Sequence, residues 1–416
     1  MNESGRGNGA DEARRVLIIG AGSTGLALAQ GLKKAGIPFV IFEQDHNAIR
    51  KRNWSMGLHW ALSALRDLVP EELMGNLQMT QVDPHVHTGD ADRLPMRNGA
   101  TGDLIKEIQS SKFYRLRRDK FRALFLQGIP VRWGKCLSGI EYSADGQTVT
   151  ARFTDGFAET GRILIGCDGP HSVVRSLLVG PENARVTPID FASTMCFTKH
   201  TRDHALFLRA EPHNPLYQVA IHPDGYCAWL SLHDGDDIDH PENWTFFHYI
   251  SFPEPRDFPN NRSNEALVAH QKELARNFVD PWKSVFEWMP DDHPVWYGKL
   301  RNWDPSLPGH QWENHLGRVT LAGDAAHPMT FQRGQGLNHA IMDAFTVHKA
   351  IDAFWSSDGS LESRVKAVVD YEAEMIARGG EEVRMSEANT TAVHNWGKIM
   401  ESPSVKRGMS LETGRD

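Results

Sequence analysis

The stretch V-L-I-I-G-A-G-S-T-G-L-A-L-A-Q-G-L-K-K-A-G-I-P-F-V-I-F-E, from Val16 to Glu43, decides the fold of this chain. Its first four residues are apolar and mostly β-branched, which is typical of a strand buried on both faces of a parallel sheet. Apolar residues then recur at helical spacing up to Gly36, a residue type that often ends a helix, and Phe39 to Phe42 forms a second apolar run. The pattern predicts a strand–helix–strand unit.

Three glycines, Gly20, Gly22 and Gly25, follow the first predicted strand. They permit a tight turn, let the backbone approach a pyrophosphate without an intervening Cβ, and let the helix pack closely on its strand. Unpaired N–H groups at the start of the helix then face the anion. Glu43, at the end of the second strand, can accept hydrogen bonds from ribose hydroxyls. Together these features predict a bound adenine dinucleotide.

Length and composition fit a globular enzyme with more than one lobe. The chain has 416 residues, of which 40% are hydrophobic and 24% are charged. The net charge of −8, from 45 basic and 53 acidic residues, argues against general nucleic-acid binding. One basic cluster is expected to form the solvated face of a helix start; it consists of Arg115, Arg117, Arg118, Lys120 and Arg122.

The cysteines, histidines and apolar runs indicate in which cellular compartment the protein lies and whether it binds a metal. The four cysteines form no CxxC pair, which favours reduced thiols and an intracellular protein. His85, His87 and the stretch from His233 to His240 lack a recognisable ligand spacing, so we expect no metal site. The first thirteen residues lack the apolar core of a signal peptide, and no run approaches the roughly 20 apolar residues of a membrane span. The expectation is a cytoplasmic protein without a membrane span.

Several further elements can be expected from pattern alone. Residues 81 to 103 are rich in Pro, Gly, Asp and His, which indicates a loop. Lys112 to Gln127 is typical of a helix, and three short strands at 131–133, 140–142 and 149–153 suggest a β-meander. Tyr217 to Leu232 alternates around Pro-Asp-Gly, which predicts a hairpin in an antiparallel sheet. Helices are expected over Asn264–Phe286, Gly336–Phe354 and Leu361–Ile376.

Two later segments repeat the design of a buried strand followed by glycine, aspartate and a turn. They are C-D-G-P-H-S-V-V-R, from Cys167 to Arg175, and G-D-A-A-H-P, from Gly323 to Pro328. Asp324 stands where a carboxylate can hydrogen-bond a ribityl chain. Gly334 to Asn338 opens a helix whose N–H groups can face an electron-rich ring edge or an anion.

Together these segments resemble the single-component, FAD-dependent aromatic hydroxylase family (group A) of flavoprotein monooxygenases, and within it the fungal members that tailor natural products. The resemblance extends from about Arg14 to Arg378; it rests on G-A-G-S-T-G with Glu43, on D-G-P-H-S-V-V-R, and on G-D-A-A-H-P followed by R-G-Q-G-L-N. It implies an α/β fold in which a Rossmann-like FAD-binding domain, of the glutathione-reductase and p-hydroxybenzoate-hydroxylase type, joins an antiparallel substrate sheet and C-terminal helices.

The resemblance also implies a division of the chain. Residues 14–185 form the first part of the FAD-binding domain, with the β-meander, and residues 186–300 form the substrate-binding sheet. Residues 301–354 complete the FAD-binding domain, and residues 355–416 form C-terminal helices and a polar tail.

By the same resemblance, individual residues take roles in binding FAD. The glycines of the first turn hold the pyrophosphate, Glu43 the adenosine ribose, and Asp324 the ribityl or pyrophosphate region. Asp168 and Gly169 belong to a segment associated with both FAD and the nicotinamide coenzyme. The full implied set is Gly20, Gly22, Ser23, Gly25, Glu43, Gln44, Arg118, Asp168, Gly169, Gly323, Asp324, Pro328, Gly334, Gly336, Leu337 and Asn338.

Two positions depart from the family pattern. Phe331-Gln332 stands where many relatives carry a proline–aromatic pair, and this change affects the shape of the pocket. Arg50 or Arg52 takes the place of the family's arginine near the moving flavin; the sequence leaves the choice open.

The implied reaction is oxygen transfer to a small-molecule substrate. NAD(P)H reduces FAD, dioxygen adds at the flavin C4a position, and the distal oxygen of the hydroperoxide passes to an electron-rich substrate while the second oxygen leaves as water. The catalytic or pocket candidates are Pro328, Tyr217, His222 and Tyr226, with Trp229 in the same region. The sequence leaves open whether the substrate is a phenol, an indole, a polyketide or a terpenoid, and whether NADH or NADPH is used. The oligomeric state is equally open.

The sequence is also compatible with other classes of flavoprotein. One is a non-catalytic flavin-binding or redox-sensing protein, and another is a flavin-dependent oxidase or Baeyer–Villiger variant on the same fold. The single GxGxxG disfavours a second dinucleotide domain, and the absence of a W-x-W-x-I-P segment disfavours a halogenase.

Overall fold

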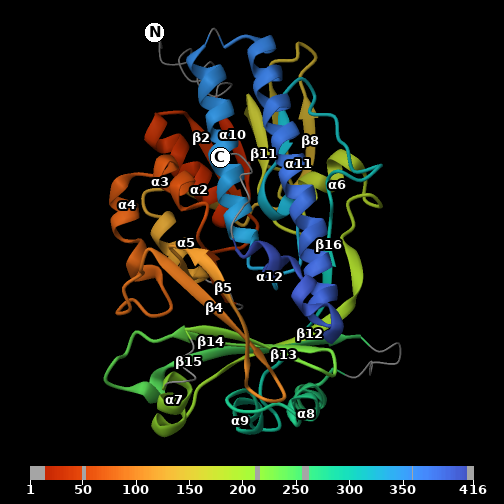
Figure 1. The fold of residues 1–416 in the computed structure, drawn as a ribbon. Helices are drawn as coiled ribbons and strands as arrows, with labels where there is room; N and C mark the ends of the chain where they lie inside the picture. Colours follow the sequence, from red (N-terminus) through yellow and green to blue (C-terminus); the bar gives the residue numbers. More distant parts are fainter. Residues whose placement is uncertain (1–14, 49–52, 211–215, 255–261, 358, 410–416) are drawn as a thin grey trace.

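The computed structural model describes residues 15–48, 53–210, 216–254, 262–357 and 359–409. The glycine-rich stretch folds as β1 (Val16–Ile19), α2 (Ser23–Ala35) and β2 (Phe39–Glu43), which confirms the predicted unit. These strands lie in a five-stranded parallel sheet of order β17-β11-β1-β2-β7, with β7 (Val131–Trp133), β11 (Ile163–Gly166) and β17 (Val319–Leu321). Helix α10 (Gly336–Ser356) packs beside α2 against this sheet (Figure 1).

The order of strands in the parallel sheet explains why the separate motifs meet. The three strands β17, β11 and β1 are neighbours, and each runs directly into one of the glycine–aspartate or glycine-rich segments. Because parallel strands end at the same edge of a sheet, the three segments come together there, although more than 300 residues separate the first from the last.

A small antiparallel sheet, formed by β8 (Leu137–Tyr142), β9 (Val149–Phe153) and β10 (Ala158–Gly161), packs on the same core. The expected meander was therefore wrong in one strand: the segment at 131–133 pairs in parallel with β2 and extends the larger sheet. A three-residue strand carries no periodicity that could distinguish the two partners.

A seven-stranded sheet forms the second lobe, shown at the bottom of Figure 1. Its order is β16-β12-β15-β14-β13-β4-β5. The predicted hairpin is confirmed as β13 paired with β14. The bounds are β4 (Ala91–Asn98), β5 (Leu104–Ser111), β12 (Thr187–Thr198), β13 (Tyr217–His222), β14 (Tyr226–Asp234), β15 (Thr245–Pro253) and β16 (Trp296–Asn302).

The loop expected between residues 81 and 103 was wrong, because β4 lies within it and pairs in parallel with β13. Leu94 and Met96 of β4 are buried, while Pro95 between them and the residues on either side are partly or fully exposed. This alternation over a short, polar strand was masked by the loop-like composition. The proposed domain boundaries at 185, 300 and 354 stay a prediction, and the β4–β5 hairpin is an excursion of the first segment into the second lobe.

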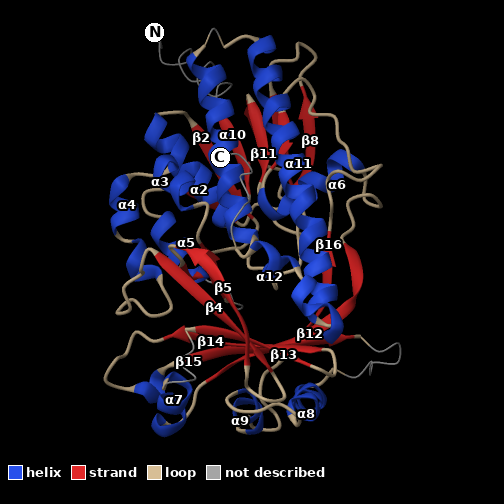
Figure 2. Cartoon of the chain, in the orientation of Figure 1, coloured by secondary structure: helices blue, strands red, loops and turns tan. Residues whose placement is uncertain are grey.

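Helices cover the seven-stranded sheet on its outer face (Figure 2). They are α7 (Arg202–Arg209), α8 (Asn264–Ala275) and α9 (Trp282–Glu287). The expected helix over 264–286 is thus two helices, with Pro281 as the N-cap of the second. On the inner side lie the C-terminal end of α11 (Leu361–Val393) and α12 (Pro403–Arg407) (Figure 1).

The basic cluster does not lie on one helix. Residues 114 to 117 form β6 (Tyr114–Arg117), which pairs antiparallel with β3 (Ser55–Leu58), and α5 (Arg118–Phe125) begins only afterwards. The helix expected from residue 112 was therefore wrong in its first six residues, because cross-strand pairing overrides local helical pattern. The remaining short elements are α3 (Leu62–Leu68), α4 (Glu71–Gly75), α6 (Val173–Val179) and the 3₁₀ turns η1 (Leu77–Thr80), η2 (Pro241–Asn243), η3 (Gly323–Ala325) and η4 (Trp396–Glu401). Among the described helices, none is long and apolar enough to cross a membrane.

Candidate cofactor and substrate site

The glycines of the first turn are required for different reasons. Gly20 has φ +106°, and a Cβ there would lie 2.4 Å from the carbonyl oxygen of Cys167. A Cβ on Gly25 would lie 2.1 Å from the carbonyl oxygen of Gly20, so the close approach of α2 to its own turn excludes a side chain. Gly22 differs, because its φ of −82° suits any residue and a Cβ there would meet no heavy atom of the described residues within 4 Å. The packing of these residues gives no reason for glycine at this position.

The N-terminus of α2 faces the same open space. Gly22 is its N-cap, no side chain in the described part of the chain caps it, and its first turn contains no acidic residue. Unpaired N–H groups and the positive end of the helix dipole are therefore available to an anion. This arrangement fits the pyrophosphate of a dinucleotide. Of the three glycines in the turn, Gly22 is the one that the described residues do not require, and a Cβ there would stand between the helix start and the anion.

Glu43 and Arg122 fix the backbone around this turn. The buried Glu43 carboxylate accepts hydrogen bonds from the N–H of Ala21 at 2.9 Å and of Asp45 at 3.1 Å. The Arg122 guanidinium donates to the carbonyl oxygens of Ala21 at 3.1 Å and Ala48 at 3.0 Å, and only 3% of Arg122 is exposed. The expectation of a solvated basic face was wrong for this residue, which sequence reasoning missed as a support of the site.

The second motif is held by its own aspartate and arginine. The Asp168 carboxylate accepts hydrogen bonds from the Ser172 hydroxyl at 2.5 Å and from two backbone N–H groups of the first turn of α6. Arg175, fully buried, donates to the carbonyl oxygens of Ala184, Ala325 and Pro170. Arg175 thus ties the second motif to the third, a role that its place at the end of the quoted motif could have suggested.

Asp324 is exposed at the surface. Protein groups nevertheless displace part of the water around its carboxyl group, which raises the pKa, and the charges of His327, Arg118 and Arg175 oppose this rise. Its Oδ1 lies 4.0 Å from the position of a Cβ on Gly336, which brings the third motif against the start of α10. The preceding Gly323 has φ +64°, and a Cβ there would lie 2.3 Å from the Thr24 hydroxyl oxygen of α2. The structure therefore brings the first and third motifs into contact.

A buried ionic network supports the loop that carries Asp324. Asp343 of α10 accepts hydrogen bonds from the N–H of Gly323 at 2.7 Å, His327 Nε2 at 2.6 Å and the Arg378 guanidinium at 2.7 Å. Burial alone would raise the pKa of Asp343, but His327 and Arg378 outweigh it and hold the pKa well below its usual range. Sequence reasoning missed Asp343, because an aspartate inside a helix has no local signal of such contacts.

At the start of α10, side chains and backbone have separate tasks. The Leu337 side chain belongs to the core of the parallel-sheet lobe. The fully buried Asn338 amide bonds the backbone of Gly57 and the backbone and ring of His59. Only the backbone of these two residues is left for a ligand. Gly334, with φ +66°, has open space where a Cβ would stand.

The other predicted cofactor residues lie around the same edge. The Ser23 hydroxyl is 3.9 Å from the Met56 sulfur, Gln44 is exposed beside Glu43, and Gly169 has φ +83° with open space at its Cβ position. The Arg118 guanidinium lies 4.2 Å from the centre of the Trp54 ring. The buried Pro328 accepts a hydrogen bond from the N–H of Trp303. The alternatives Arg50 and Arg52 lie outside the described residues.

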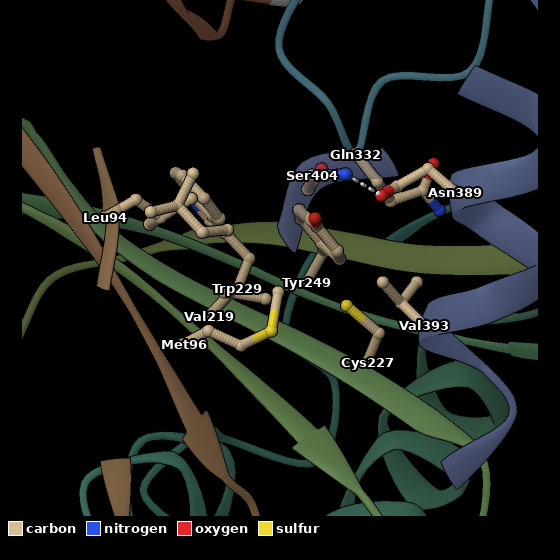
Figure 3. A pocket seen from close by; sticks show the side chains of 11 residues that line it. Leu94, Met96, Val219, Cys227, Trp229, Tyr249, Gln332, Asn389, Val393 and Ser404 are labelled. Atoms are coloured by element: carbon tan, nitrogen blue, oxygen red, sulfur yellow. Dashed lines mark hydrogen bonds between the residues drawn. The ribbon is translucent and has the colours of Figure 1, made fainter. Parts of the chain in front are cut away.

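A cavity separates the seven-stranded sheet from α11 and α12 (Figure 3). Trp229 and Tyr249 project from the sheet, and Gln332 and Asn389 approach from the loop before α10 and from α11. The Gln332 Nε2 is buried without a hydrogen-bond partner among the described residues. The complete lining is Leu94, Met96, Ile108, Val219, Cys227, Trp229, Tyr249, Gln332, Asn389, Val393 and Ser404.

Of the pocket candidates, Tyr217 and Trp229 lie on the inner face of the sheet, and two others do not. His222 packs on Phe278 and bonds the carbonyl oxygen of Asn277, and Tyr226 packs against the core under α8 and α9. His222 and Tyr226 therefore do not line this cavity, contrary to the prediction that they are pocket residues. Side chains alternate between the two faces of a strand, and no local pattern indicates which face borders the cavity.

The site defines the class of protein. An uncapped helix start after a glycine turn, a carboxylate at the end of the next strand, and two further loops at the same sheet edge form a dinucleotide-binding oxidoreductase site beside an apolar cavity. Residues 13–231 and 311–367 match the family model described as FAD binding domain. The chain belongs to this family, that of the FAD-dependent monooxygenases, which confirms the resemblance seen in the sequence and makes FAD its cofactor.

Curated relatives agree along nearly the whole chain. The FAD-dependent monooxygenase cctM of Talaromyces islandicus is 40% identical over 399 residues, covering 96% of this chain and 97% of the relative. The FAD-dependent monooxygenase phnB of Penicillium herquei is 37% identical over 408 residues, covering 96% of each.

Solved structures share the fold. Klebsiella pneumoniae HpxO, complexed with FAD and uric acid, superposes with a TM-score of 0.70 at 21% identity, covering 93% of this chain and 90% of HpxO. P. aeruginosa PqsL, in complex with 2-aminobenzoylacetate, gives a TM-score of 0.71 at 18% identity, covering 94% and 99%. The expected fold class, α/β with an antiparallel substrate sheet, is confirmed.

Proposed function

We propose that this monooxygenase uses NAD(P)H and dioxygen to hydroxylate or epoxidise an electron-rich small molecule of secondary metabolism. One observation carries the proposal: the loop that leads from Pro328 into α10 borders both the cofactor edge of the parallel sheet and the cavity. Phe331 of this loop meets the Tyr249 ring at a centroid distance of 5.0 Å, and Gln332 lines the cavity. A substrate in the cavity would therefore lie next to the flavin end of the cofactor site.

The same proposal assigns the cofactor contacts. Gly22 and the start of α2 hold the FAD pyrophosphate, Glu43 the adenosine ribose, and Asp324 the ribityl region. The remaining predicted cofactor residues keep the roles given by the resemblance, with Leu337 and Asn338 contributing backbone atoms. Tyr217 and Pro328 border the substrate and the flavin.

FAD, when bound, would supply the redox chemistry by accepting a hydride and activating dioxygen, and the C4a-hydroperoxide route is part of what we propose. The chain positions the substrate and excludes water from it. The cavity walls are mainly apolar, which keeps water away from the reacting atoms. The Gln332 Nε2, which has no hydrogen-bond partner among the described residues, is suited to donate a hydrogen bond to a substrate oxygen and so to fix the orientation of the ring.

The visible absorbance spectrum of the purified protein tests this function. Bleaching of the oxidised-flavin band by NADPH or NADH, accelerated by a metabolite extract, is the expected result, followed by an oxygen-18 label from ¹⁸O₂ in the product. A flavin band that neither coenzyme bleaches would contradict the proposal and favour a flavin-binding or redox-sensing protein. Bleaching without label in any product would instead favour an oxidase.

A further inference from the structure

Arg115 of β6 is an arginine that the assigned site does not use. Its guanidinium lies 5.0 Å from the centre of the Trp229 ring, one of the walls of the cavity. It also lines a second hollow beside the first, together with Asp92, Phe113 and Tyr217. The Tyr217 and Trp229 rings are parallel at a centroid distance of 6.0 Å, so this hollow, called here the side hollow, adjoins the cavity through these two rings.

The charge of Arg115 has no counter-ion in the described part of the chain. Its guanidinium makes no hydrogen bond or ion pair there, and its Nε is buried without a partner. Two carboxylates line the side hollow, and both have other partners: Asp92 accepts a hydrogen bond from the Tyr217 hydroxyl, and Asp83 pairs with Arg209 at 2.9 Å. Arg117, two residues further on the same strand, shows the contrast, because it pairs with Asp119 at 2.6 Å and with Asp234.

An arginine in this position is destabilising unless something offsets it. Burial lowers the pKa of Arg115 to about 10, against the opposing effect of Tyr217 and Tyr249, so the side chain is still charged at neutral pH. The side chain as a whole is only partly buried, but its Nε is out of contact with water, so part of the hydration of the charge is lost. The contact with the Trp229 ring offsets part of this loss. The planar guanidinium fork is well suited to bind an anionic oxygen.

We propose that Arg115 binds an anionic oxygen of a planar aromatic substrate, a carboxylate or phenolate, whose rings pack against Trp229 and Tyr249. The inference rests on the proposed function, and it narrows the substrates to aromatic acids and acidic phenols. In this arrangement Arg115 selects and orients the substrate from the side hollow. Gln332 donates a hydrogen bond to another oxygen of the substrate at the loop side of the cavity.

The test is calorimetric titration of the FAD-loaded enzyme at about pH 8 with two matched pairs of probes. The carboxylate arm compares 2-naphthoate with 2-naphthamide, and the phenolate arm compares 4-nitrophenolate with 4-nitroanisole. The expected result is that at least one anion binds the wild type about 10- to 100-fold more tightly than its neutral partner. The arm that shows the preference identifies the source of the anionic oxygen.

Variants decide whether Arg115 is responsible. Arg115→Gln should abolish the preference without changing the binding of the neutral probe, and Arg115→Lys should retain part of it. Arg117→Gln, which removes the same charge from an ion-paired neighbour, should leave the preference intact. Flavin content and melting temperature report whether each variant folds. If Arg115→Gln does not fold and Arg115→Lys does, the lysine variant must still bind the anionic probe several-fold more weakly than the wild type.

Three results would overturn the inference: no preference in the wild type, a full preference in Arg115→Gln, or no binding of any probe up to about 10 mM. Coenzyme oxidation by the wild type is measured in parallel. An enzyme that oxidises NADPH but lacks the anion preference contradicts this inference alone. An Arg115-dependent preference in a protein that never oxidises NADPH or NADH contradicts the proposed function alone.

Discussion

Gly22→Ala should separate cofactor binding from folding. The added methyl group meets no atom of the described residues within 4 Å, and the φ of −82° at this position is ordinary for alanine. Alanine is a poorer N-cap than glycine, by about 0.5–1 kcal/mol, so the flavin-free variant should melt within a few degrees of the wild type. The same methyl group stands between the start of α2 and the proposed pyrophosphate.

The expected loss of FAD affinity follows from the contacts that are displaced. A hydrogen bond between a backbone N–H and a charged phosphate oxygen contributes about 1.5–3 kcal/mol. Losing one such bond weakens FAD binding by about 10- to 150-fold, because each 1.4 kcal/mol is a factor of about ten. Fluorescence titration of the apoprotein with FAD measures the dissociation constant, and the flavin-to-protein ratio after purification gives an independent reading.

Gly25→Ala is the matched control, because it adds the same methyl group on the same helix. There the methyl carbon would lie 2.1 Å from the Gly20 carbonyl oxygen, so the variant should lose about 3 kcal/mol or more of folding stability, with or without FAD. Wild-type FAD affinity in Gly22→Ala would refute the placement of the pyrophosphate at this helix. A strongly destabilised Gly22→Ala apoprotein would show that the glycine is structural after all.

Three further outcomes follow from the same geometry. Asp343→Asn should lower the free energy of unfolding in urea by about 3–5 kcal/mol. The folded-state pKa of Asp343 lies below the value of about 3.9 in an unfolded chain. The loss of unfolding free energy relative to the wild type should therefore be complete above about pH 4 and shrink as the pH falls further. Asp324→Ala should purify largely free of flavin while keeping its far-UV circular dichroism, and full flavin occupancy would remove Asp324 from the site. His222→Ala should change substrate-stimulated NADPH oxidation less than about twofold, whereas Trp229→Ala should reduce it at least about tenfold; equal effects would contradict the assignment of the two faces of the sheet.

Local pattern was sufficient for the cofactor half of the molecule. The strand, helix and strand from Val16 to Glu43 have strong periodicities, and the glycine turn between them is a short-range requirement that a sequence displays directly. The loops at Asp168 and Asp324 were recognisable for the same reason. Each motif is built by residues close together in the chain, and the parallel sheet then brings the three strand ends to one edge.

The supports of that edge were not predictable in the same way. Asp343, Arg378 and Arg122 act on backbone atoms of loops far from them in sequence. Nothing in the residues next to them signals such a partner, because a long-range hydrogen bond leaves no periodicity. The basic cluster illustrates the point: five similar side chains are distributed over a strand and a helix, and burial gives them different roles.

The substrate half was decided by tertiary structure. The sequence showed an alternating hairpin, and alternation states only that neighbouring side chains face opposite ways. Which face is covered by α8 and α9, and which borders the cavity, depends on how the hairpin joins β4, β15 and the C-terminal helices. The sequence by itself determined the fold class and the family; only the packing of distant elements placed Trp229 on the cavity and left Arg115 beside it without a counter-ion among the described residues.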